Sequence, residues 1–400
     1  MDVDEQLARR IGARVRAQRQ VNRQKQIVVA ELAGITADYL YQVERGKKLP
    51  TVAVLTELAK ILRVPVGALL DEQPEPTHRS RATETTEAVY RSLTGPLEDA
   101  EPMPASELRE RIGSAWRIWQ TAPQRYSAIT PLLPDLVSSA RLAESAVAGT
   151  RRDVARCAVS LYALLRTVLK RFGRLDLALL AADRGMRAAA FAEDERWLAV
   201  ARWNLAHVLL ADNRSEHACE VARTAAADLR GLVAGGDRAA SALSGSANLL
   251  GAVANVRRGE LWAAHQHLRE AAVLAARTGE CNVGWTAFGP TNVAMHAVNI
   301  EAGAGEFTEA LRLAERVEFS EAPSIERRAA FLVDQASAYL HQRDHAGALC
   351  VLRDLHRAAP EDIAERPAAR EALHTVVQRG RRSVAQDAAR LAAGAGIPLS

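Results

Sequence analysis

Three asparagines recur at equal intervals and constrain the fold of most of the chain. Asn204, Asn248 and Asn292 stand 44 residues apart, and setting them in register aligns a helix, a turn with Gly or Asp, and a second helix in each unit. A similar unit follows 42 residues later, with Asp334 in place of asparagine. Because a single helix pair cannot bury its own apolar face, this period predicts about six antiparallel pairs stacked into a right-handed solenoid with a concave surface.

Small residues stand where the second helix of each unit should cross the first. Apolar residues make up 48% of the chain but aromatic residues only 4%, a balance that favours helices rich in alanine. Trp116 and Trp119, three apart beside Ile112, are expected to pack in the core. The residues at the predicted crossings are Ala178, Ala218, Ala264, Ala310 and Ala348.

Several classes of protein are disfavoured by what the sequence lacks. It contains no run of 18 apolar residues, and its first residues, MDVDEQLARR, hold no apolar signal core, so we expect a cytoplasmic protein without a membrane partner. The four cysteines form no C-x-x-C pair, and His265 and His267 would face apart on a helix, so no metal site is expected. Phosphate-loop, nucleophile-elbow and zinc-protease signatures are missing, so we expect neither an enzyme nor a cofactor.

Positive charge gathers at the N-terminus. Residues 1–70 hold 12 Lys/Arg against 7 Asp/Glu, a net charge of +5, whereas the whole chain sums to +4. The remaining residues therefore sum to about −1. A basic head on a near-neutral body indicates a polyanionic partner for the head alone.

The basic head reads as five short helices. The first covers about 5–21, where Leu7, Ile11 and Val15 form one apolar stripe, and the second covers about 25–33. Gly34 suits a tight turn, and Thr36 is a good N-cap for a third helix over about 37–45. Two more helices complete the head, one after residue 51 and one ending at residue 70.

Residues 11–70 resemble the Xre/phage-repressor helix-turn-helix family without gaps. The matching segments are IGARVRAQRQ, VAELAGIT, YLYQVERGKKLP and LAKILRVPVGALL. The resemblance implies a five-helix, lambda-repressor-like domain whose third helix lies in the major groove of double-stranded DNA. The fold class that we expect is therefore all-α, with this domain followed by the helical solenoid.

The resemblance also assigns roles to individual residues. Gln26 and Thr36 match positions that bind the DNA backbone, and groove-facing Gln42 could pair with adenine in a bidentate way. Asp38 could accept from a cytosine amine, and Ala37 could touch a thymine methyl. The complete set expected to contact DNA is Arg19, Gln26, Thr36, Ala37, Asp38, Tyr41, Gln42, Arg45, Lys47 and Lys48.

Two features depart from the family pattern. Gln24 stands where an apolar residue is usual, and Ile27 and Val28 stand where polar ones are usual. The apolar pair either docks on another element, such as a dimer mate or the C-terminal domain, or is an ordinary surface pair.

Between head and repeats, residues 71–104 are rich in Pro, Glu and Thr and read as a flexible acidic linker. A short helix around Glu87–Leu93 could dock, since Val89, Tyr90 and Leu93 would share a face. The expected domains are therefore residues 1–70, the linker 71–104, and residues 105–400.

The repeat units resemble tetratricopeptide repeats, although they exceed the usual length and lack the full motif. ASAYLHQRDHAGALCVLRDLHRAAP is the nearest single match. With the head, the segments RIWQTAPQRYSAITPLLPDLV and FGPTNVAMHAV make nearly the whole chain similar to actinobacterial helix-turn-helix regulators with C-terminal repeats. That resemblance implies a DNA-binding regulator whose repeats dimerise and sense a ligand.

Two asparagine rows mark the first helices of the units. Asn204, Asn248 and Asn292 form one row, and Asn255 and Asn299, seven residues further on, lie on about the same face. Such a ladder can bind the backbone of a peptide through both its oxygen and its nitrogen, as in tetratricopeptide receptors. Alternatively, these asparagines cap helices or bridge repeats inside the stack. The expected ligand-binding set is Asn204, His207, Asn248, Asn255, Asn292, His296 and Asn299.

These observations together predict a transcription regulator that binds operator DNA in the nucleoid. Because one head reads about half a site, we expect a homodimer on a palindromic operator. By resemblance, an oligopeptide or a small molecule is the expected ligand. The alternative is an adaptor whose solenoid docks a protein partner without control by a small ligand.

Overall fold

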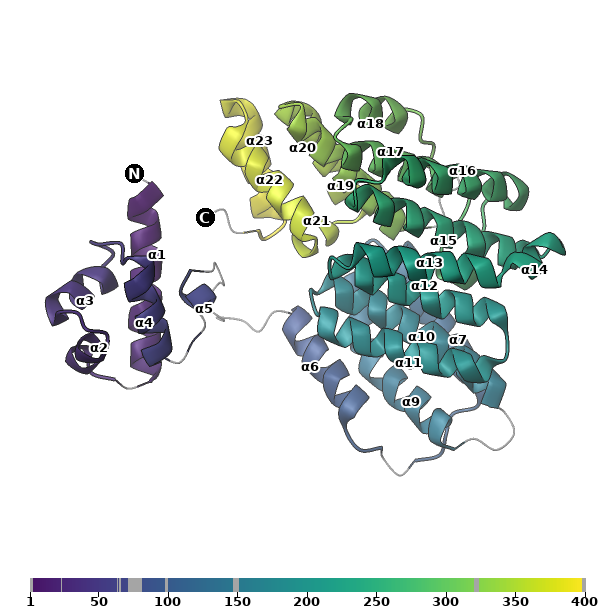
Figure 1. The fold of residues 1–400 in the computed structure, drawn as a ribbon, viewed down its shortest axis with the longest axis horizontal. Helices are drawn as coiled ribbons and strands as arrows, with labels where there is room; N and C mark the ends of the chain where they lie inside the picture. The colour runs from purple at the N-terminus through teal and green to yellow at the C-terminus, as the bar shows by residue number, and fades with distance from the viewer. Residues whose placement is uncertain are drawn as a thin grey trace. The chain divides into compact units, whose positions relative to one another are not determined.

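The structure is a computed structural model that describes residues 3–22, 24–62, 64, 66–70, 81–97, 100–146, 151–319 and 324–397. The chain divides into two compact units, Met1–Arg79 and Ser80–Ser400. In the described residues the regular structure is helical, apart from one isolated backbone bridge between Cys281 and Phe288. The predicted all-α fold, a small helical domain followed by a helical solenoid, is confirmed (Figure 1).

The N-terminal unit contains the five predicted helices, with bounds shifted by a few residues at most. Their apolar sides meet in one core that includes Val15, Leu40 and Leu58, each 0% exposed. The helices are α1 (Val3–Val21), α2 (Gln26–Leu32), α3 (Ala37–Glu44), α4 (Val52–Leu62) and α5 (Val66–Leu70).

Three residues set the position of α3. Gly34 has a φ of 65°, a left-handed turn conformation that glycine adopts without steric cost. Thr36 caps the helix as predicted, because its Oγ1 accepts a hydrogen bond from the Tyr39 amide at 3.1 Å. Where α1 crosses α3, a Cβ at Gly12 would lie 2.0 Å from the Val43 carbonyl oxygen, so only glycine permits this close approach.

A further helix, α6 (Arg81–Thr94), belongs to the second unit. Val89 and Leu93, one turn apart, are both 0% exposed and pack in the large core of that unit, whereas Tyr90 is 46% exposed. Tyr90 therefore does not share the docking face that we expected. The composition of residues 71–104 suggested a linker, yet part of this range is a packed helix, because two apolar residues at helical spacing outweigh the polar majority.

The rest of the second unit is a series of helix pairs (Figure 1). The first helix of each pair contacts both its partner and the first helix of a neighbouring pair. The first of these helices, with their connectors, are α7 (Ala105–Thr121), α8 (Arg125–Ile129), η1 (Thr130–Leu132), α9 (Leu133–Ser145), α10 (Arg151–Arg171), α11 (Leu175–Ala192), α12 (Glu195–Ala211), α13 (Ser215–Asp228) and α14 (Arg230–Ala234). The series continues with α15 (Arg238–Arg257), α16 (Leu261–Thr278), η2 (Val283–Trp285), α17 (Pro290–Ala304), α18 (Phe307–Ala314), α19 (Ile325–His341), α20 (His345–Ala358), α21 (Asp362–Glu365), α22 (Pro367–Arg379) and α23 (Arg382–Gly394).

The alanines predicted at the helix crossings are confirmed as packing residues. Each is 0% exposed and lies on the second helix of its pair, where a small side chain lets the two helices approach closely. The buried alanines are Ala178, Ala218, Ala264, Ala310 and Ala348. Trp116 and Trp119, also predicted to be core residues, are 3% and 0% exposed.

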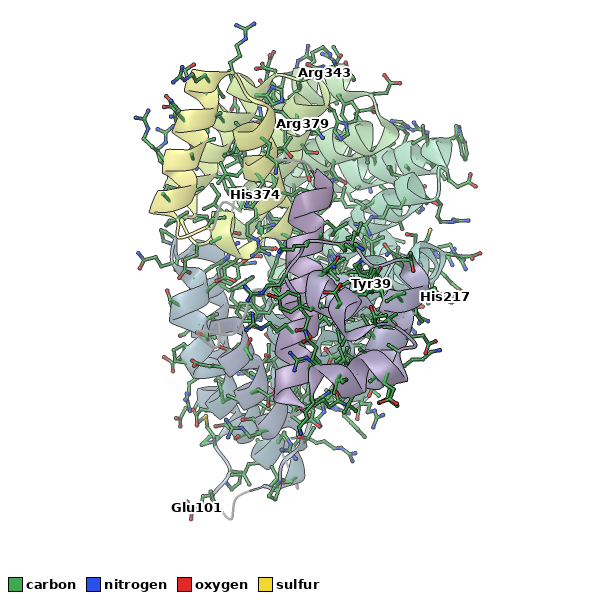
Figure 2. All side chains as sticks on the ribbon, turned by 90° about the vertical axis from the view of Figure 1, so that its left-hand side faces the viewer. Tyr39, Glu101, His217, Arg343, His374 and Arg379 are labelled. Atoms are coloured by element: carbon green, nitrogen blue, oxygen red, sulfur yellow. The ribbon has the colours of Figure 1, made fainter. Side chains whose placement is uncertain are left out.

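The turns within five pairs share one backbone conformation. Each contains a residue with positive φ, which reverses the chain between two antiparallel helices. Glycine fills three of these positions, asparagine one and an exposed arginine, Arg343, the fifth (Figure 2). The five residues are Gly173 (φ 73°), Asn213 (φ 58°), Gly259 (φ 78°), Gly305 (φ 87°) and Arg343 (φ 60°).

Contacts link early and late helices of the second unit. Nη2 of Arg125, in α8, lies 2.5 Å from Oδ1 of Asp362, in α21, and both side chains are 0% exposed. Arg171, at the end of α10, pairs with Glu326 at the start of α19. These ion pairs join the start of the second unit to its last helices. Among the described residues, every helix is too short or too polar to cross a membrane.

Candidate nucleic-acid interface and repeat interior

Helix α3 presents a polar face to solvent. Asp38, Tyr41 and Arg45 are exposed and Gln42 is half-buried, whereas Leu40, on the opposite face, is 0% exposed. Ala37 at the start of the helix and its cap Thr36 are exposed as well. The residues predicted to face the groove thus lie together on one accessible surface.

Two of these side chains are joined to one another. The amide Nε2 of Gln42 donates a hydrogen bond of 2.6 Å to Oδ2 of Asp38, one helical turn earlier. An amide nitrogen carries two hydrogens, and within the described part of the chain neither the second hydrogen nor Oε1 of Gln42 has a side-chain partner, which leaves both for a contact with adenine. Asp38 thereby fixes the orientation of Gln42. The sequence suggested a cytosine amine as the partner of Asp38, and within the protein Asp38 accepts from Gln42.

Arg19 and Gln26 both bind one carboxylate, that of Glu44. Nε and Nη2 of Arg19 lie 2.6 and 3.0 Å from the two oxygens of Glu44, and Nε2 of Gln26 donates to the same carboxylate at 2.9 Å. The hydrogen bond to Glu44 raises the pKa of Arg19. Since the side chain of Arg19 is only 14% exposed, this geometry favours a role in positioning α1, α2 and α3 over the DNA contact that we expected.

Exposed cations follow the end of α3. Lys47 and Lys48 are exposed, and Nζ of Lys48 lies 5.5 Å from the centre of the Tyr39 ring. The guanidinium of Arg45 lies 5.5 Å from the centre of the Tyr41 ring. These cation–π contacts leave the charges in solvent, where they can reach phosphates.

Helix α2 carries an exposed apolar surface. Ile27 is 63% exposed, Val28 is 42% exposed and Leu32 is 62% exposed. Ile27 and Val28 are the apolar pair that departs from the pattern of the helix-turn-helix family, and Leu32 extends their exposed surface. Gln24, the other departure, is half-buried, and its backbone oxygen accepts from Nη1 of Arg19 at 3.0 Å.

Four of the asparagines predicted to bind a ligand join helices to one another. Oδ1 of Asn204 accepts from Arg166 Nε at 2.9 Å, which links α12 to α10. Oδ1 of Asn248 lies 2.8 Å from Nδ1 of His267. Further links join Asn255 to Cys219 at 3.4 Å and Asn299 to Asp334 at 2.8 Å. For these residues the geometry favours bridging between helices, the alternative raised from the sequence.

The remaining three candidates, His207, Asn292 and His296, meet at a small cavity between α12, α15 and α17. Its volume is about 10 Å³, room for about one water molecule. Asn292 is 4% exposed, and neither its Oδ1 nor Nε2 of His207 has a hydrogen-bond partner among the described residues. Burial and nearby Arg327 lower the pKa of His296 to about 4. Burial and nearby Lys170 hold the pKa of His207 well below its ordinary range.

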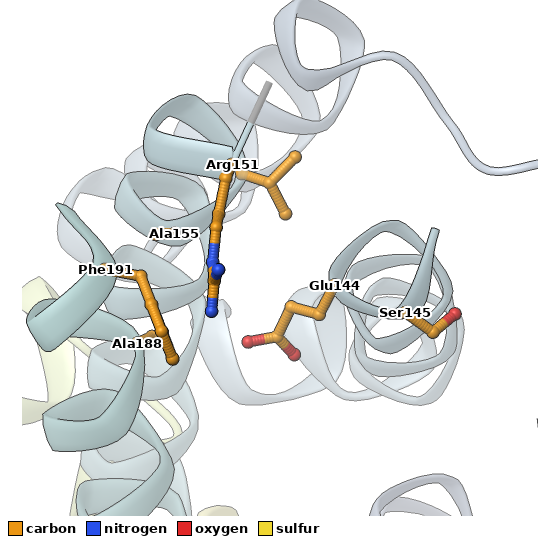
Figure 3. A pocket seen from close by; sticks show the side chains of 7 residues that line it. Glu144, Ser145, Arg151, Ala155, Ala188 and Phe191 are labelled. Atoms are coloured by element: carbon orange, nitrogen blue, oxygen red, sulfur yellow. The ribbon is translucent and has the colours of Figure 1, made fainter. Parts of the chain in front are cut away.

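Larger hollows lie elsewhere in the second unit and were not predicted. One of about 340 Å³ lies between α9, α10 and α11, where the Arg151 guanidinium stacks 3.8 Å from the centre of the Phe191 ring and Glu144 approaches from the other side (Figure 3). Another, of about 520 Å³, lies between α6 and α9. Their lining residues fall outside the register of the repeats, so no periodic signal marks them.

Comparison with known proteins finds similarity in the N-terminal part of the chain. A family model described as a helix-turn-helix domain matches residues 10–73. Two uncharacterised HTH-type transcriptional regulators of Mycobacterium tuberculosis, MT0491 (strain CDC 1551 / Oshkosh) and Rv0474 (strain ATCC 25618 / H37Rv), are each 40% identical to this chain over 58 residues. The match spans 14% of this chain and 41% of each relative.

Solved structures give weaker similarities. Bacillus thuringiensis PlcR, in a complex with the peptide PapR7 and DNA, covers 67% of this chain and 95% of its own at 11% identity, with a TM-score of 0.31. The apo form of the competence regulator ComR from Streptococcus vestibularis covers 98% and 100% at 11% identity, with a TM-score of 0.32. Scores this low carry no conclusion about the second unit. The match over residues 10–73, together with helices α1 to α5, identifies a helix-turn-helix domain in the N-terminal unit.

Proposed function

We propose that this chain is a sequence-specific, DNA-binding transcription regulator of the Xre type, acting in the cytoplasm on nucleoid DNA. The observation that carries the proposal is the polar, solvent-exposed face of α3, which is followed directly by exposed Lys47 and Lys48. Sequence-specific binding needs contacts to base edges and contacts to phosphates. The polar side chains on one face of α3 can make the first, and the cations after its end can make the second.

Within this interface the residues divide by chemistry. Gln42, held by Asp38, reads a base edge, and Tyr41 and Ala37 supply apolar contact in the groove. Lys47, Lys48 and Arg45 neutralise phosphates, so the affinity falls steeply with salt concentration. Backbone contacts from Gln26 and Thr36 set the register of the domain on the duplex.

One helix-turn-helix domain covers only about half of a typical operator. We therefore infer a homodimer that binds a palindromic site, with half-sites one or two helical turns apart. Its second unit controls the distance between the two heads in response to a peptide or small molecule. Such a ligand acts only through different affinities for two arrangements of the repeats.

The chemistry of the repeat interior favours ligand sensing over the adaptor alternative. Asn292 and His207 present to a small cavity polar atoms that have no partner among the described residues, a costly arrangement for a purely structural core. An adaptor needs only an outer surface and gains nothing from such atoms. We propose Asn292, His207 and His296 as the ligand-facing residues.

The proposal is tested by selecting random duplex DNA with the full chain. We expect enrichment of a motif with two-fold symmetry and binding that weakens as salt increases. Enrichment of no motif, or of one that depends on neither α3 nor salt, would contradict the proposed function.

A further inference from the structure

The interior of the second unit contains more positive than negative charge. Arg166 and Lys170 lie one turn apart on α10, and Arg327 reaches the interior from α19. The carboxylate nearest to them, Glu326, pairs with Arg171 and lies 3.7 Å from Arg366. Its charge is therefore shared with other cations.

Two of these cations lie against the same aromatic ring. The guanidinium of Arg166 lies 5.5 Å from the centre of the Trp203 ring, and that of Arg327 lies 5.9 Å from it. Arg166 is 3% exposed, and its hydrogen bonds go to the neutral amide of Asn204. Like charges gathered around one indole repel each other unless an anion joins them.

Lys170 and Arg327 make no ion pair and no hydrogen bond within the described part of the chain, although both are half-buried. Burial, and next the charges of Arg171 and Arg166, hold the pKa of Lys170 well below its ordinary value. Burial is the main reason why the pKa of Arg327 is lowered. Attraction by Glu326 raises this pKa, and repulsion from Arg171 and Arg366 lowers it further. Arg166, Lys170 and Arg327 therefore have no carboxylate partner among the described residues.

Neutral hydrogen-bonding groups complete the arrangement. Arg327 lines the same cavity as Asn292 and His207, whose polar atoms have no partner among the described residues. An oxyanion needs donors, and neutral histidine supplies one from Nε2 in the matching tautomer. Rotation of the Asn292 amide by half a turn would present its NH₂ group to the cavity.

We propose that the interior of the second unit binds an oxyanion, a carboxylate or phosphate group, between Lys170, Arg166 and Arg327, with His207 and Asn292 as neutral donors. This inference rests on the proposed sensing function and names the chemical class of the ligand. The cavity of about 10 Å³ is smaller than such a group, so binding requires the lining side chains to move apart.

Coupling to the rest of the unit follows from Glu326. An oxyanion among these cations lies near Glu326 and repels its carboxylate, and Glu326 pairs with Arg171 between α10 and α19. Binding therefore loosens or reshapes the contact between α10 and α19. A change in the curvature of the repeats is the expected result.

The test compares thermal melting of the full chain in sodium chloride, sodium phosphate and sodium acetate at constant ionic strength. Two further arms use a pool of hexapeptides with free C-terminal carboxylates and the same pool with amidated ends. At least one oxyanion should raise the melting temperature above its value in chloride. Loss of the effect on amidation assigns the group to a peptide terminus, and an effect of phosphate alone assigns it to a phosphate source. No rise in any arm would overturn the inference.

Two variants sharpen the test. Lys170→Met should weaken the apparent oxyanion affinity about tenfold or more, because it removes a charge-assisted hydrogen bond. It should also raise the melting temperature without ligand, since the unneutralised charge is gone. The matched control is Arg187→Gln on α11, whose side chain is 78% exposed, and it should retain the wild-type response. An oxyanion response of Lys170→Met equal to that of the control, or a lower melting temperature without ligand, would contradict the proposed site.

Binding of the selected operator, measured in parallel by fluorescence anisotropy, separates this inference from the proposed function. Sequence-specific DNA binding by a wild-type chain that responds to no oxyanion overturns the oxyanion site alone. Absence of sequence-specific DNA binding overturns the proposed function, whatever the melting experiments give.

Discussion

Replacing Glu44 with glutamine tests how the helix-turn-helix domain holds its reading helix. The carboxylate of Glu44 is 4% exposed and accepts from Arg19 and Gln26, so one charge links α1, α2 and α3. Glutamine keeps the shape but removes the charge, which leaves the guanidinium of Arg19 without its counter-ion at 14% exposure.

The size of the effect follows from the geometry. Hydrogen bonds to charged groups contribute about 1.5–3 kcal/mol, and breaking a well-buried ion pair costs about 3–5 kcal/mol. Because Arg19 keeps some contact with water, we expect Glu44→Gln to destabilise the domain by about 2–3 kcal/mol. Small domains are stable by only about 5 kcal/mol or a little more, so this loss is large.

Hydrogen exchange measures this loss of stability of the N-terminal domain within the full chain. Amides of α2, α3 and α4 should exchange about 30- to 150-fold faster in Glu44→Gln, as expected for 2–3 kcal/mol. Glu57→Gln, which removes an exposed partner of Lys60, should change exchange by less than a factor of about three. Equal protection in Glu44→Gln and wild type would refute the proposed linkage by Glu44.

Three other predictions concern separate parts of the chain. The double variant Lys47→Ala and Lys48→Ala should weaken binding to all DNA sequences alike. In anisotropy titrations, the slope of log affinity against log salt concentration should fall by about two. A loss of affinity confined to the operator would argue against phosphate contacts. Gly259→Ala should destabilise the second unit by about 1–2 kcal/mol in chemical denaturation, because alanine is strained at a positive φ. Arg343→Gly should leave the stability equal or slightly higher. The opposite order of stabilities would contradict the role of left-handed turns in the stability of the unit. The pKa of His296, lowered to about 4 in the folded chain, makes the neutral form stabilising above about pH 6.5, and this contribution is lost as pH falls toward 4. His296→Gln should therefore flatten the fall in melting temperature between pH 6.5 and 4, while the exposed control His217→Gln should not; matching profiles for the two variants would count against a buried neutral His296.

Local patterns predicted most of the helices and many of the packing residues. The cap at Thr36, the turn at Gly34 and the crossing alanines such as Ala264 depend on neighbours within a few residues or on the repeat itself. These are interactions that spacing along the chain encodes directly. Residue type alone does not predict every left-handed turn, because Arg343 has a positive φ at the position where other repeats have glycine.

Contacts between distant segments could not be predicted in this way. Arg125 and Asp362 are separated by 237 residues, and no spacing rule connects them. The same holds for Glu44, whose partner Arg19 was expected to bind phosphate. For the asparagine rows, periodicity placed the residues on one side of the first helices but could not show that most of them bond to neighbouring helices.

Replacing Gln42 with alanine tests most directly whether α3 recognises DNA sequence. Random duplex DNA should be selected in parallel with the wild-type chain and with Gln42→Ala, at the same salt concentration. We predict a symmetric wild-type motif in which the variant loses its preference at one base pair in each half-site, worth about 1–3 kcal/mol, while its non-specific affinity and salt slope stay the same. An identical motif from both chains, or no motif from the wild type, would contradict the claim.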